Sequence, residues 1–400
     1  MNVFYFTEQP YPDAWNPEAT SLRVTLPNSE CDPSVMADLY ARYFDEWMLA
    51  DELGFDLMVN EHHATATCLS SVAGVTLSIL ARQTKRARLL TLGYPIANRL
   101  DPVRIAEELA MIDVISHGRL EMGFVRGVPY ELGVTQKSAV GMTDRFWEAH
   151  DLILKALSTR DGPFNWQGKH FQARNVNVWP RPYQDPHPPV WISGRSRSNI
   201  RDIASRGHVF ATFLSGKQTA GMFDYYREVA AELGHATPSA DRFAYLGIVA
   251  VADTHDKAMQ RARILVNYLR TSALVAEPFD NPPGYMSAAD SARMMRANGK
   301  RTAKSASGKA VDVHSGSIEE LIDAGAMFVG TPDEVYEQIA AFDDDVGGLG
   351  NLLMMGHAAS LSHADTVDNL TLFGKEVLPR LKQRSASRIT VSRELEQAGT

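Results

Sequence analysis

Cysteine is scarce in this chain, which has only two among its 400 residues. Two cysteines do not make the dense disulfide framework of small secreted proteins, so Cys31 and Cys68 are expected to be free thiols in a reducing compartment. The start of the chain lacks a basic leader before an apolar run, and no apolar stretch approaches the roughly 20 residues that span a bilayer. These absences predict a cytoplasmic protein without a membrane segment.

Positive charge is also in short supply, with 40 basic against 48 acidic residues and a formal net charge of -8. An acidic chain repels polyanions, so nucleic acid and anionic membranes are not expected as partners. A small neutral or anionic ligand is easier for such a chain to accommodate.

Several catalytic signatures are absent as well. The sequence has no Walker A loop, no GxSxG nucleophile elbow and no paired-cysteine zinc pattern. No GxGxxG follows a predicted strand, and the nearest glycine cluster, at residues 347–350, precedes one and is typical of a turn. Kinase, serine hydrolase and Rossmann-type dinucleotide functions are therefore disfavoured.

The sequence does contain a recurring unit, in which an amphipathic helix ends in a short glycine turn and a β-branched or aromatic run follows. Gly54, Gly118 and Gly207 occupy this turn in three units, where the backbone needs a left-handed conformation that glycine adopts without a Cβ clash. The pairs Asp101-Pro102 and Thr331-Pro332 are typical helix starts. Helix and strand are therefore predicted to alternate along the chain.

The predicted strands lie in one continuous chain without a polar linker. They are residues 2–7, 55–61, 87–96, 119–125, 189–194, 208–214, 243–252 and 349–356. Eight such units favour an α/β fold of the (β/α)₈ TIM-barrel type over a doubly wound sheet. The barrel domain is predicted to span residues 1–383, and the polar residues 384–400 a flexible tail.

Two segments interrupt the repeat. Residues 159–189 are rich in glycine, proline and aromatic residues, which predicts a hairpin before the fifth strand. Residues 277–316 precede the eighth strand and contain no acidic residue from 291 to 311. A stretch of this length without regular structure predicts either disorder or a functional lid.

Ligands of a TIM barrel bind where its strands end, and one candidate there is Asn60-Glu61-His62-His63. The His62 imidazole can accept or donate a proton near neutral pH, which makes it the candidate catalytic residue. A glutamate with two histidines also suggests a metal. Neighbouring side chains of a strand point to opposite faces, however, so both histidines bind one ion only if the turn starts between them. The alternative is that these residues cap the strand and pack under a loop.

A second candidate combines Arg126, at the end of the fourth strand, with the SGRSRSN turn at residues 193–199. A guanidinium, hydroxyl groups and backbone N–H groups at a helix start are the donors that suit a phosphate. The turn supplies them through Gly194, Arg195, Ser196 and Asn199. The alternative is an ordinary serine N-cap with solvated arginines, but Arg126 on the neighbouring strand favours the phosphate site.

These motifs together resemble those of the bacterial luciferase-like flavin-dependent monooxygenases over nearly the whole chain. The resemblance rests on NEHH, DPVRIAEELAMIDVISHGRLEMGFVRG, PPVWISGRSRSNIRDIASRG, FVGTPDEVYEQI and LFGKEVLPRL, in this order. It implies reduced FMN as cosubstrate, supplied by a separate NAD(P)H:flavin reductase, and a C4a-peroxyflavin that oxygenates a small apolar substrate such as an aldehyde or ketone. It also implies a homodimer, and a lid at residues 277–316, where luciferase carries its mobile loop.

The resemblance also assigns roles to single residues. Arg126 and Ser196 match the phosphate-binding arginine and serine, and His62 matches the active-site histidine. Three residues depart from the luciferase α chain, which has cysteine, an acidic residue and threonine where this chain has Val125, Arg195 and Asn199. Oxygenation without light emission is therefore expected. Asn98 and Arg99, in the loop after the third strand, are further candidates to touch the flavin or its ribityl chain.

Three other functions remain open on the same barrel. A deazaflavin-dependent dehydrogenase would transfer hydride without oxygen, and a non-catalytic flavin-binding protein would bind FMN without consuming it. A metal-dependent hydrolase built on Glu61, His62 and His63 would be inactivated by chelators.

Overall fold

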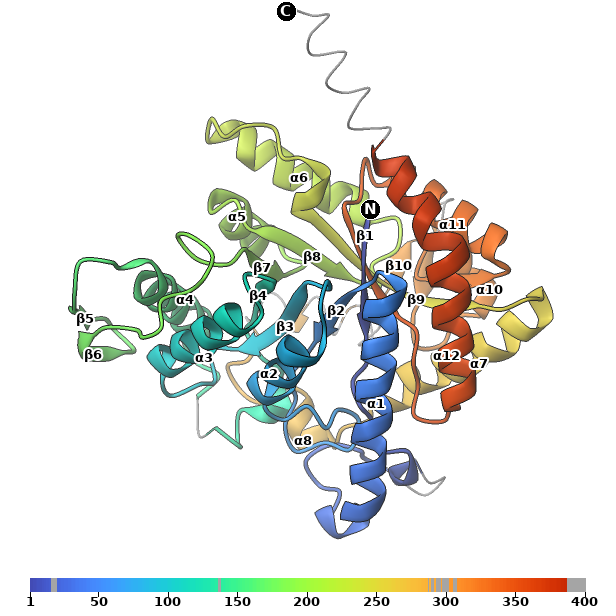
Figure 1. Ribbon diagram of the computed structural model, residues 1–400, viewed down its shortest axis with the longest axis horizontal. Coiled ribbons are helices and arrows are strands. Elements are labelled where there is room, and N and C mark those ends of the chain that lie inside the picture. Colours follow the sequence, from blue (N-terminus) through green and yellow to red (C-terminus); the bar gives the residue numbers. More distant parts are fainter. Residues whose placement is uncertain are drawn as a thin grey trace, which may run out of the picture.

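A closed barrel of eight parallel strands forms the centre of the protein, with helices around its outside (Figure 1). The computed structural model describes residues 1–15, 20–135, 138–286, 288, 291–292, 296, 302–304 and 308–386. The barrel strands are β1 (Asn2–Phe6), β2 (Asp56–Val59), β3 (Leu89–Pro95), β4 (Leu120–Val125), β7 (Val190–Ser193), β8 (Val209–Phe213), β9 (Phe243–Val251) and β13 (Asn351–Met355). The helices that follow them are α1 (Pro33–Leu53), α2 (Ala73–Gln83), α3 (Pro102–Ile115), α4 (Met142–Ser158), α5 (Arg197–Ser205), α6 (Thr219–Glu232), α7 (His255–Ser272) and α12 (His363–Leu372).

Strand pairing closes the barrel in chain order, because β13 pairs in parallel with both β9 and β1. The predicted (β/α)₈ architecture is thereby confirmed. A ninth parallel strand that the sequence analysis did not predict, β12 (Met327–Gly330), pairs with the C-terminal half of β9 beyond the point where β8 ends. The helices α10 (Ile318–Asp323) and α11 (Pro332–Asp345) flank β12.

Local signals predicted from the sequence are present in the fold. Asp101 accepts hydrogen bonds from two backbone N–H groups at the start of α3, and Thr331 and Glu334 form a capping box at α11. Gly54 ends α1 with a φ of 89°, and Gly118 and Gly207 also have positive φ. These caps stop each helix where the chain turns back into the barrel.

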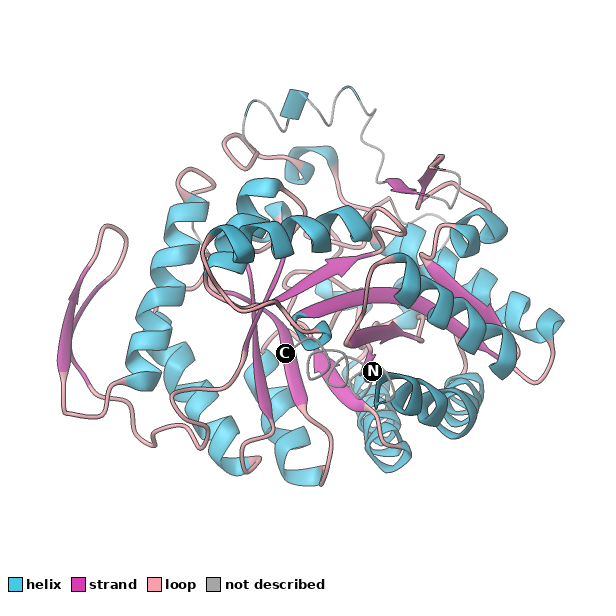
Figure 2. Cartoon of the chain, turned by 90° about the horizontal axis from the view of Figure 1, so that it is seen from above, coloured by secondary structure: helices cyan, strands magenta, loops and turns pink. Residues whose placement is uncertain are grey.

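Both insertions are placed as predicted along the chain. The strands β5 (Phe164–Gln167) and β6 (Gln172–Val176) form an antiparallel hairpin that projects away from the barrel (Figure 2). The described parts of residues 277–316 contain α8 (Glu277–Asp280) and a second hairpin of β10 (Thr302–Lys304) and β11 (Ala310–Asp312). Part of the predicted lid at residues 277–316 lies outside the described residues.

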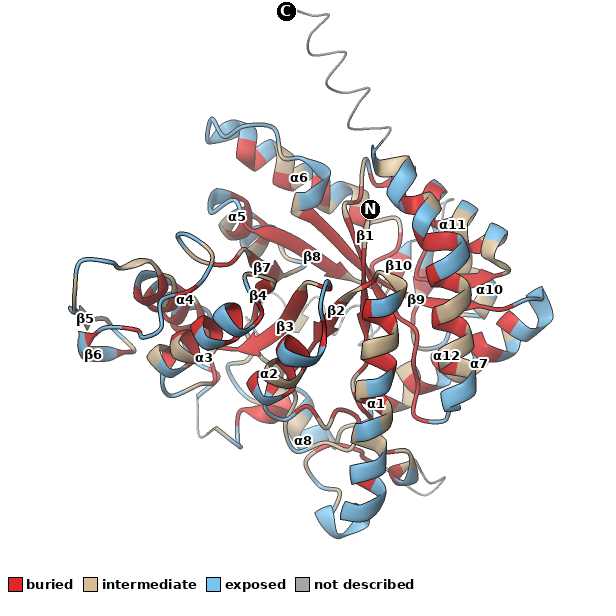
Figure 3. Ribbon diagram, in the orientation of Figure 1, coloured by how far each residue is buried: buried red, intermediate tan, exposed pale blue. Residues whose placement is uncertain are grey.

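Side chains fill the interior of the barrel, and its strands are almost wholly buried (Figure 3). The rings of Phe4 and Trp191 pack edge to face with centroids 5.3 Å apart, and the Trp191 indole N–H donates to Glu121 at 2.7 Å. A filled interior leaves the strand ends as the place for a ligand.

The two cysteines and the C-terminal residues were also the subject of predictions from the sequence. Cys31 and Cys68 are free, as expected. Arg384, the first residue of the predicted tail, still forms ion pairs with Asp343 and Asp344, and residues 387–400 of that tail lie outside the described part of the chain. Within the described residues, no helix has both the length and the apolar character needed to cross a membrane.

Candidate active site

The C-terminal ends of neighbouring strands bring the predicted site residues to one rim of the barrel. His62 follows β2, Asn98 follows β3, Arg126 follows β4 and Ser196 follows β7. These strands are adjacent in that order and all run in the same direction. The rim therefore carries the imidazole at one side and the predicted phosphate donors at the other.

His62 is held by a short 3₁₀ turn, η3 (Pro129–Glu131), that follows β4. Its Nδ1 lies 2.8 Å from Oε1 of Glu131 and 3.3 Å from the Tyr130 hydroxyl. Its Nε2 lies 3.9 Å from Oε1 of Glu8, which is beyond hydrogen-bond distance. The side chain of His62 is 21% exposed, so one edge of the ring remains accessible.

His63 faces a different carboxylate from His62. Its Nε2 lies 3.2 Å from Oε1 of Glu61, and this hydrogen bond raises the pKa of His63. Glu61 also accepts from Arg99 at 2.5 Å and from the backbone N–H of Ala73 at 2.9 Å. The two histidines thus point apart, and the described residues contain no group of three side chains placed to hold a metal.

Glu8, two residues after the end of β1, lies on the same side of the rim. It accepts hydrogen bonds from the Asn60 amide at 3.1 Å and from the Tyr268 hydroxyl at 2.6 Å. Its backbone N–H donates to Nε2 of His357, whose Nδ1 lies 2.9 Å from the Phe6 carbonyl. Burial lowers the pKa of His357 to about 4, so this ring is neutral at neutral pH. Glu8 is therefore fixed in position beside His62.

The end of β4 presents the cation of Arg126. The Arg126 guanidinium stacks on the Tyr285 ring at 4.5 Å and forms no hydrogen bond or ion pair with a described residue. Asn98 is buried after the neighbouring strand β3, and both polar atoms of its amide lack a hydrogen-bond partner among the described residues. A Cβ on Gly127 would lie 2.5 Å from this amide, so only glycine lets it sit there. Val125, the last residue of β4, is half-buried.

The turn after β7 lies next to Arg126, because Phe124 of β4 pairs with Ile192 of β7. Ser196 caps α5, and its hydroxyl accepts the backbone N–H of Asn199 at 3.3 Å. A Cβ on Gly194 would lie 2.5 Å from the Asn199 amide, so a larger residue there would displace this side chain.

These donors fit the phosphate and polar chain of FMN. An uncommitted guanidinium and a hydroxyl at a helix start suit a phosphate, and a buried amide without a partner suits the polar groups beyond it. Arg195, exposed on the same turn, donates to the Thr302 carbonyl of β10 at 3.4 Å. The predicted phosphate residues are thus brought together on β4 and β7, whereas Arg99 is paired with Glu61.

The sequence analysis missed the acidic partners of His62. Glu8 stands immediately after the first strand, and Glu131 stands five residues after Arg126. Their positions at strand ends were a usable signal, since carboxylates there face the rim. The contact between Glu131 and His62 was not predictable from the sequence, because it depends on how η3 crosses the barrel mouth.

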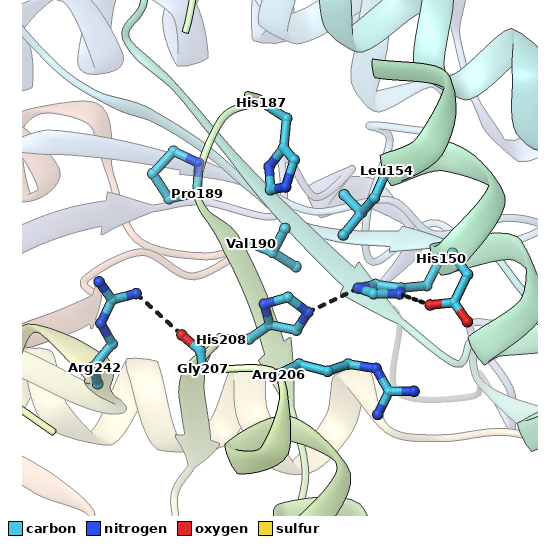
Figure 4. A pocket seen from close by; sticks show the side chains of 10 residues that line it. His150, Leu154, His187, Pro189, Val190, Arg206, Gly207, His208 and Arg242 are labelled. Atoms are coloured by element: carbon cyan, nitrogen blue, oxygen red, sulfur yellow. Dashed lines mark hydrogen bonds and ion pairs between the residues drawn. The ribbon is translucent and has the colours of Figure 1, made fainter. Parts of the chain in front are cut away.

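A cavity of about 440 Å³ lies at the other end of the barrel, where β7 and β8 begin. Figure 4 shows the His208 ring pointing toward that of His150, with Nε2 atoms 2.8 Å apart. The cavity is also lined by His187, Arg206 and Arg242 and contains none of the predicted site residues. Burial and the neighbouring positive charges lower the pKa of His208 to about 2.

This buried histidine predicts acid sensitivity of the fold. In the unfolded chain a histidine takes up a proton near pH 6.5, whereas folded His208 stays neutral, so stability is lost as the pH falls below 6.5. The free energy of unfolding is expected to be about 2 kcal/mol lower at pH 5 than at pH 7 from this residue alone. Urea unfolding of the wild type and His208→Gln at both pH values tests this, and equal pH dependence in the two proteins would contradict it.

Comparisons with known proteins identify the family of the chain. Residues 25–347 match the family of luciferase-like monooxygenases. The chain is 30% identical over 180 residues (44% of this chain, 49% of the relative) to the oxygenase component of the flavin-dependent trigonelline monooxygenase of Acinetobacter baylyi. It is 24% identical over 344 residues (84% of this chain, 92% of the relative) to the alkanal monooxygenase alpha chain of Aliivibrio fischeri.

A solved structure shares the fold. The oxygenating constituent of 3,6-diketocamphane monooxygenase from Pseudomonas putida, in complex with FMN, superposes with a TM-score of 0.69 at 21% identity, covering 94% of this chain and 98% of that one. The family match covers most of the chain and confirms the predicted enzyme class, a flavin-dependent monooxygenase. The chain therefore belongs to the luciferase-like monooxygenase family.

Proposed function

We propose that this protein is the oxygenase component of a two-component system, which uses reduced FMN and O₂ to oxygenate a small organic substrate such as an aldehyde or ketone. One oxygen atom enters the substrate and the other leaves as water, while the reduced flavin is oxidised. The proposal rests on two groups of the rim that also holds His62. The Arg126 guanidinium forms no hydrogen bond or ion pair with a described residue, and the buried Asn98 amide has no hydrogen-bond partner among the described residues. Bound FMN supplies the electrons that activate O₂.

The phosphate end of the cofactor is assigned to β4 and β7. Arg126 provides the charge, and Ser196 and Asn199 provide hydrogen-bonding groups at the start of α5, where the helix dipole favours an anion. Gly194 allows the backbone to approach, and Arg195 adds a second cation at the edge. In this proposal Asn98 and the half-buried Val125 lie between the phosphate and the reacting end of the flavin. The Asn98 amide, which has no hydrogen-bond partner among the described residues, faces the polar chain of the cofactor.

The reacting end is assigned to His62. Its Nε2 forms no hydrogen bond with a described residue, so this atom is available to hold or donate a proton at the oxygen being transferred. The filled barrel beneath the rim keeps water from reaching the site from below, which protects the reaction from unproductive loss of hydrogen peroxide.

A lid over the site is assigned to residues 277–316. Near its start, the Tyr285 hydroxyl donates to the Gly127 carbonyl at 2.9 Å. Near its end, the Thr302 carbonyl accepts from Gln218, in the loop after β8, at 2.7 Å. The described parts of this segment thus touch the rim at both β4 and β8, which supports a lid that covers bound flavin.

The proposed reaction is tested with isotopically labelled oxygen. The protein is titrated anaerobically with reduced FMN and then mixed with ¹⁸O₂ and a panel of aldehydes and ketones, and one ¹⁸O atom per product molecule is expected. Hydride transfer from a reduced deazaflavin without oxygen would instead establish a dehydrogenase. FMN bound without oxygen-dependent consumption would establish a binding protein, and substrate turnover lost to a chelator would establish a metal-dependent hydrolase.

Reduced FMN is expected to come from a separate NAD(P)H:flavin reductase. The relative from Acinetobacter baylyi is itself described as an oxygenase component, which supports a two-protein arrangement. A cytoplasmic location, where NAD(P)H is available, fits this supply.

The homodimer is proposed to form through helices α2 and α3. The adjacent helices α2 and α3 expose Val75, Met111, Val114 and Ile115, with exposed fractions of 60%, 50%, 36% and 40%. Exposed apolar side chains on neighbouring helices are typical of a subunit interface. A two-fold axis would place the same patch of a second copy against it.

Charged residues in this patch are expected to separate the dimer. The double variant Val75→Glu, Met111→Glu loses apolar contacts from both copies, so its dimer dissociation constant should rise on the order of 100-fold. Light scattering after size-exclusion chromatography measures the mass across a dilution series. Leu233→Glu, an exposed apolar residue at the end of α6, is the control. A wild type that elutes as a monomer would rule out the dimer.

A further inference from the structure

The carboxylate of Glu131 is buried directly behind the His62 ring. Its side chain is 1% exposed, and its Oε1 lies 2.8 Å from His62 Nδ1 and 2.9 Å from the backbone nitrogen of His63. Because Oε1 accepts the backbone N–H of His63, it acts as a hydrogen-bond acceptor, and its contact with His62 therefore places a proton on Nδ1. In the neutral ring, Nε2 then carries the lone pair.

The opposite edge of the ring is open. Glu8 Oε1 is 3.9 Å from Nε2, and the Glu8 carboxylate already accepts from Asn60 and Tyr268. No described residue forms a hydrogen bond with Nε2. This nitrogen is thus the atom of His62 that a ligand at the rim can reach.

The turn that carries Glu131 is itself anchored. The Tyr130 hydroxyl accepts a hydrogen bond from Arg23, whose guanidinium also lies 4.7 Å above the Tyr130 ring. Arg23 in turn donates through Nε to the Ser272 carbonyl at the end of α7, at 2.7 Å. The carboxylate is therefore held at a set distance from His62 by contacts that His62 does not make.

We propose that Glu131 is a positioning residue that fixes His62 as its Nδ1–H tautomer and aims Nε2 at the substrate. The inference rests on the proposed role of His62. A proton accepted at Nε2 produces an imidazolium whose Nδ1–H stays bound to Glu131, and the same proton returns from Nε2. Glu131 never takes a proton itself, but it stabilises the charged ring.

The tautomer is directly measurable without cofactor. Nitrogen-15 NMR of the protein labelled at histidine distinguishes protonated from unprotonated ring nitrogens, and comparison with His62→Ala assigns the signals. The wild type is expected to show Nδ1–H, and Glu131→Ala a population with Nε2–H. Glu131→Gln keeps an acceptor oxygen and should retain Nδ1–H. Glu46→Gln is the matched control, because Glu46 is also buried and lies 2.9 Å from a histidine Nδ1, that of His363 at the start of α12.

Activity measurements on the same variants complete the test. Glu131→Ala is expected to lower the rate of coupled oxygenation about 10²- to 10⁴-fold, with partial rescue in Glu131→Gln and no effect in Glu46→Gln. The double variant His62→Ala, Glu131→Ala should be no slower than His62→Ala alone, because Glu131 acts through that ring.

The outcomes separate the inference from the proposed function. An unchanged Nδ1–H tautomer in Glu131→Ala, or an Nε2–H tautomer in the wild type, overturns the role of Glu131 whatever the activity. Full coupled oxygenation in His62→Ala, together with a tautomer change in Glu131→Ala, would keep the positioning contact but remove the catalytic role of His62.

Discussion

His62→Ala is expected to lower the yield of oxygenated product per flavin oxidised by about 10²-fold or more, while reduced FMN is still consumed by oxygen. The Nε2 atom of the His62 imidazole forms no hydrogen bond with a described residue, so it can hold or donate a proton at the reacting oxygen. Without it, reduced flavin and oxygen should release hydrogen peroxide instead of product. Product and peroxide are measured together after single-turnover mixing with O₂ and substrate.

The neighbouring histidine provides the control for this variant. His63→Ala removes an imidazole of the same kind that faces Glu61 instead of Glu131, so its coupling should stay near that of the wild type. If His62→Ala left both the oxygenation rate and its coupling to flavin oxidation unchanged, the assignment of His62 would be wrong.

Arg126→Ala is expected to weaken the binding of reduced FMN by about 10- to 100-fold. A hydrogen bond to a charged group contributes about 1.5–3 kcal/mol, and the free guanidinium is the main cation that β4 offers to a phosphate. Reduced riboflavin has no phosphate, so its affinity should change little. Anaerobic titration of both flavins against the variant measures the difference.

An arginine at the far end of the barrel serves as the control. Arg206→Ala removes a guanidinium that stacks on Trp147 beside the cavity of Figure 4, and it should bind FMN like the wild type. Equal losses for FMN and riboflavin in Arg126→Ala would place Arg126 away from the phosphate.

Much of the architecture was predictable because its signals are local. The eight barrel strands, the caps at Asp101 and Thr331 and the hairpin before β7 follow from patterns within a few residues. The strand β12 was missed because it leads at once into the capping box of α11, whose helix-start signal follows it directly.

Residue patterns along the chain were enough to predict the barrel, the order of its strands and the residues at their ends. They also predicted that His62, Asn98, Arg126 and Ser196 lie on one rim, since parallel strands share an end. The partners of these residues depend on the three-dimensional packing. Glu131 lies 69 positions from His62 in the chain, and their 2.8 Å contact exists because η3 crosses from β4 to β2. A hydrogen bond depends on tenths of an ångström, which residue spacing along a chain does not encode.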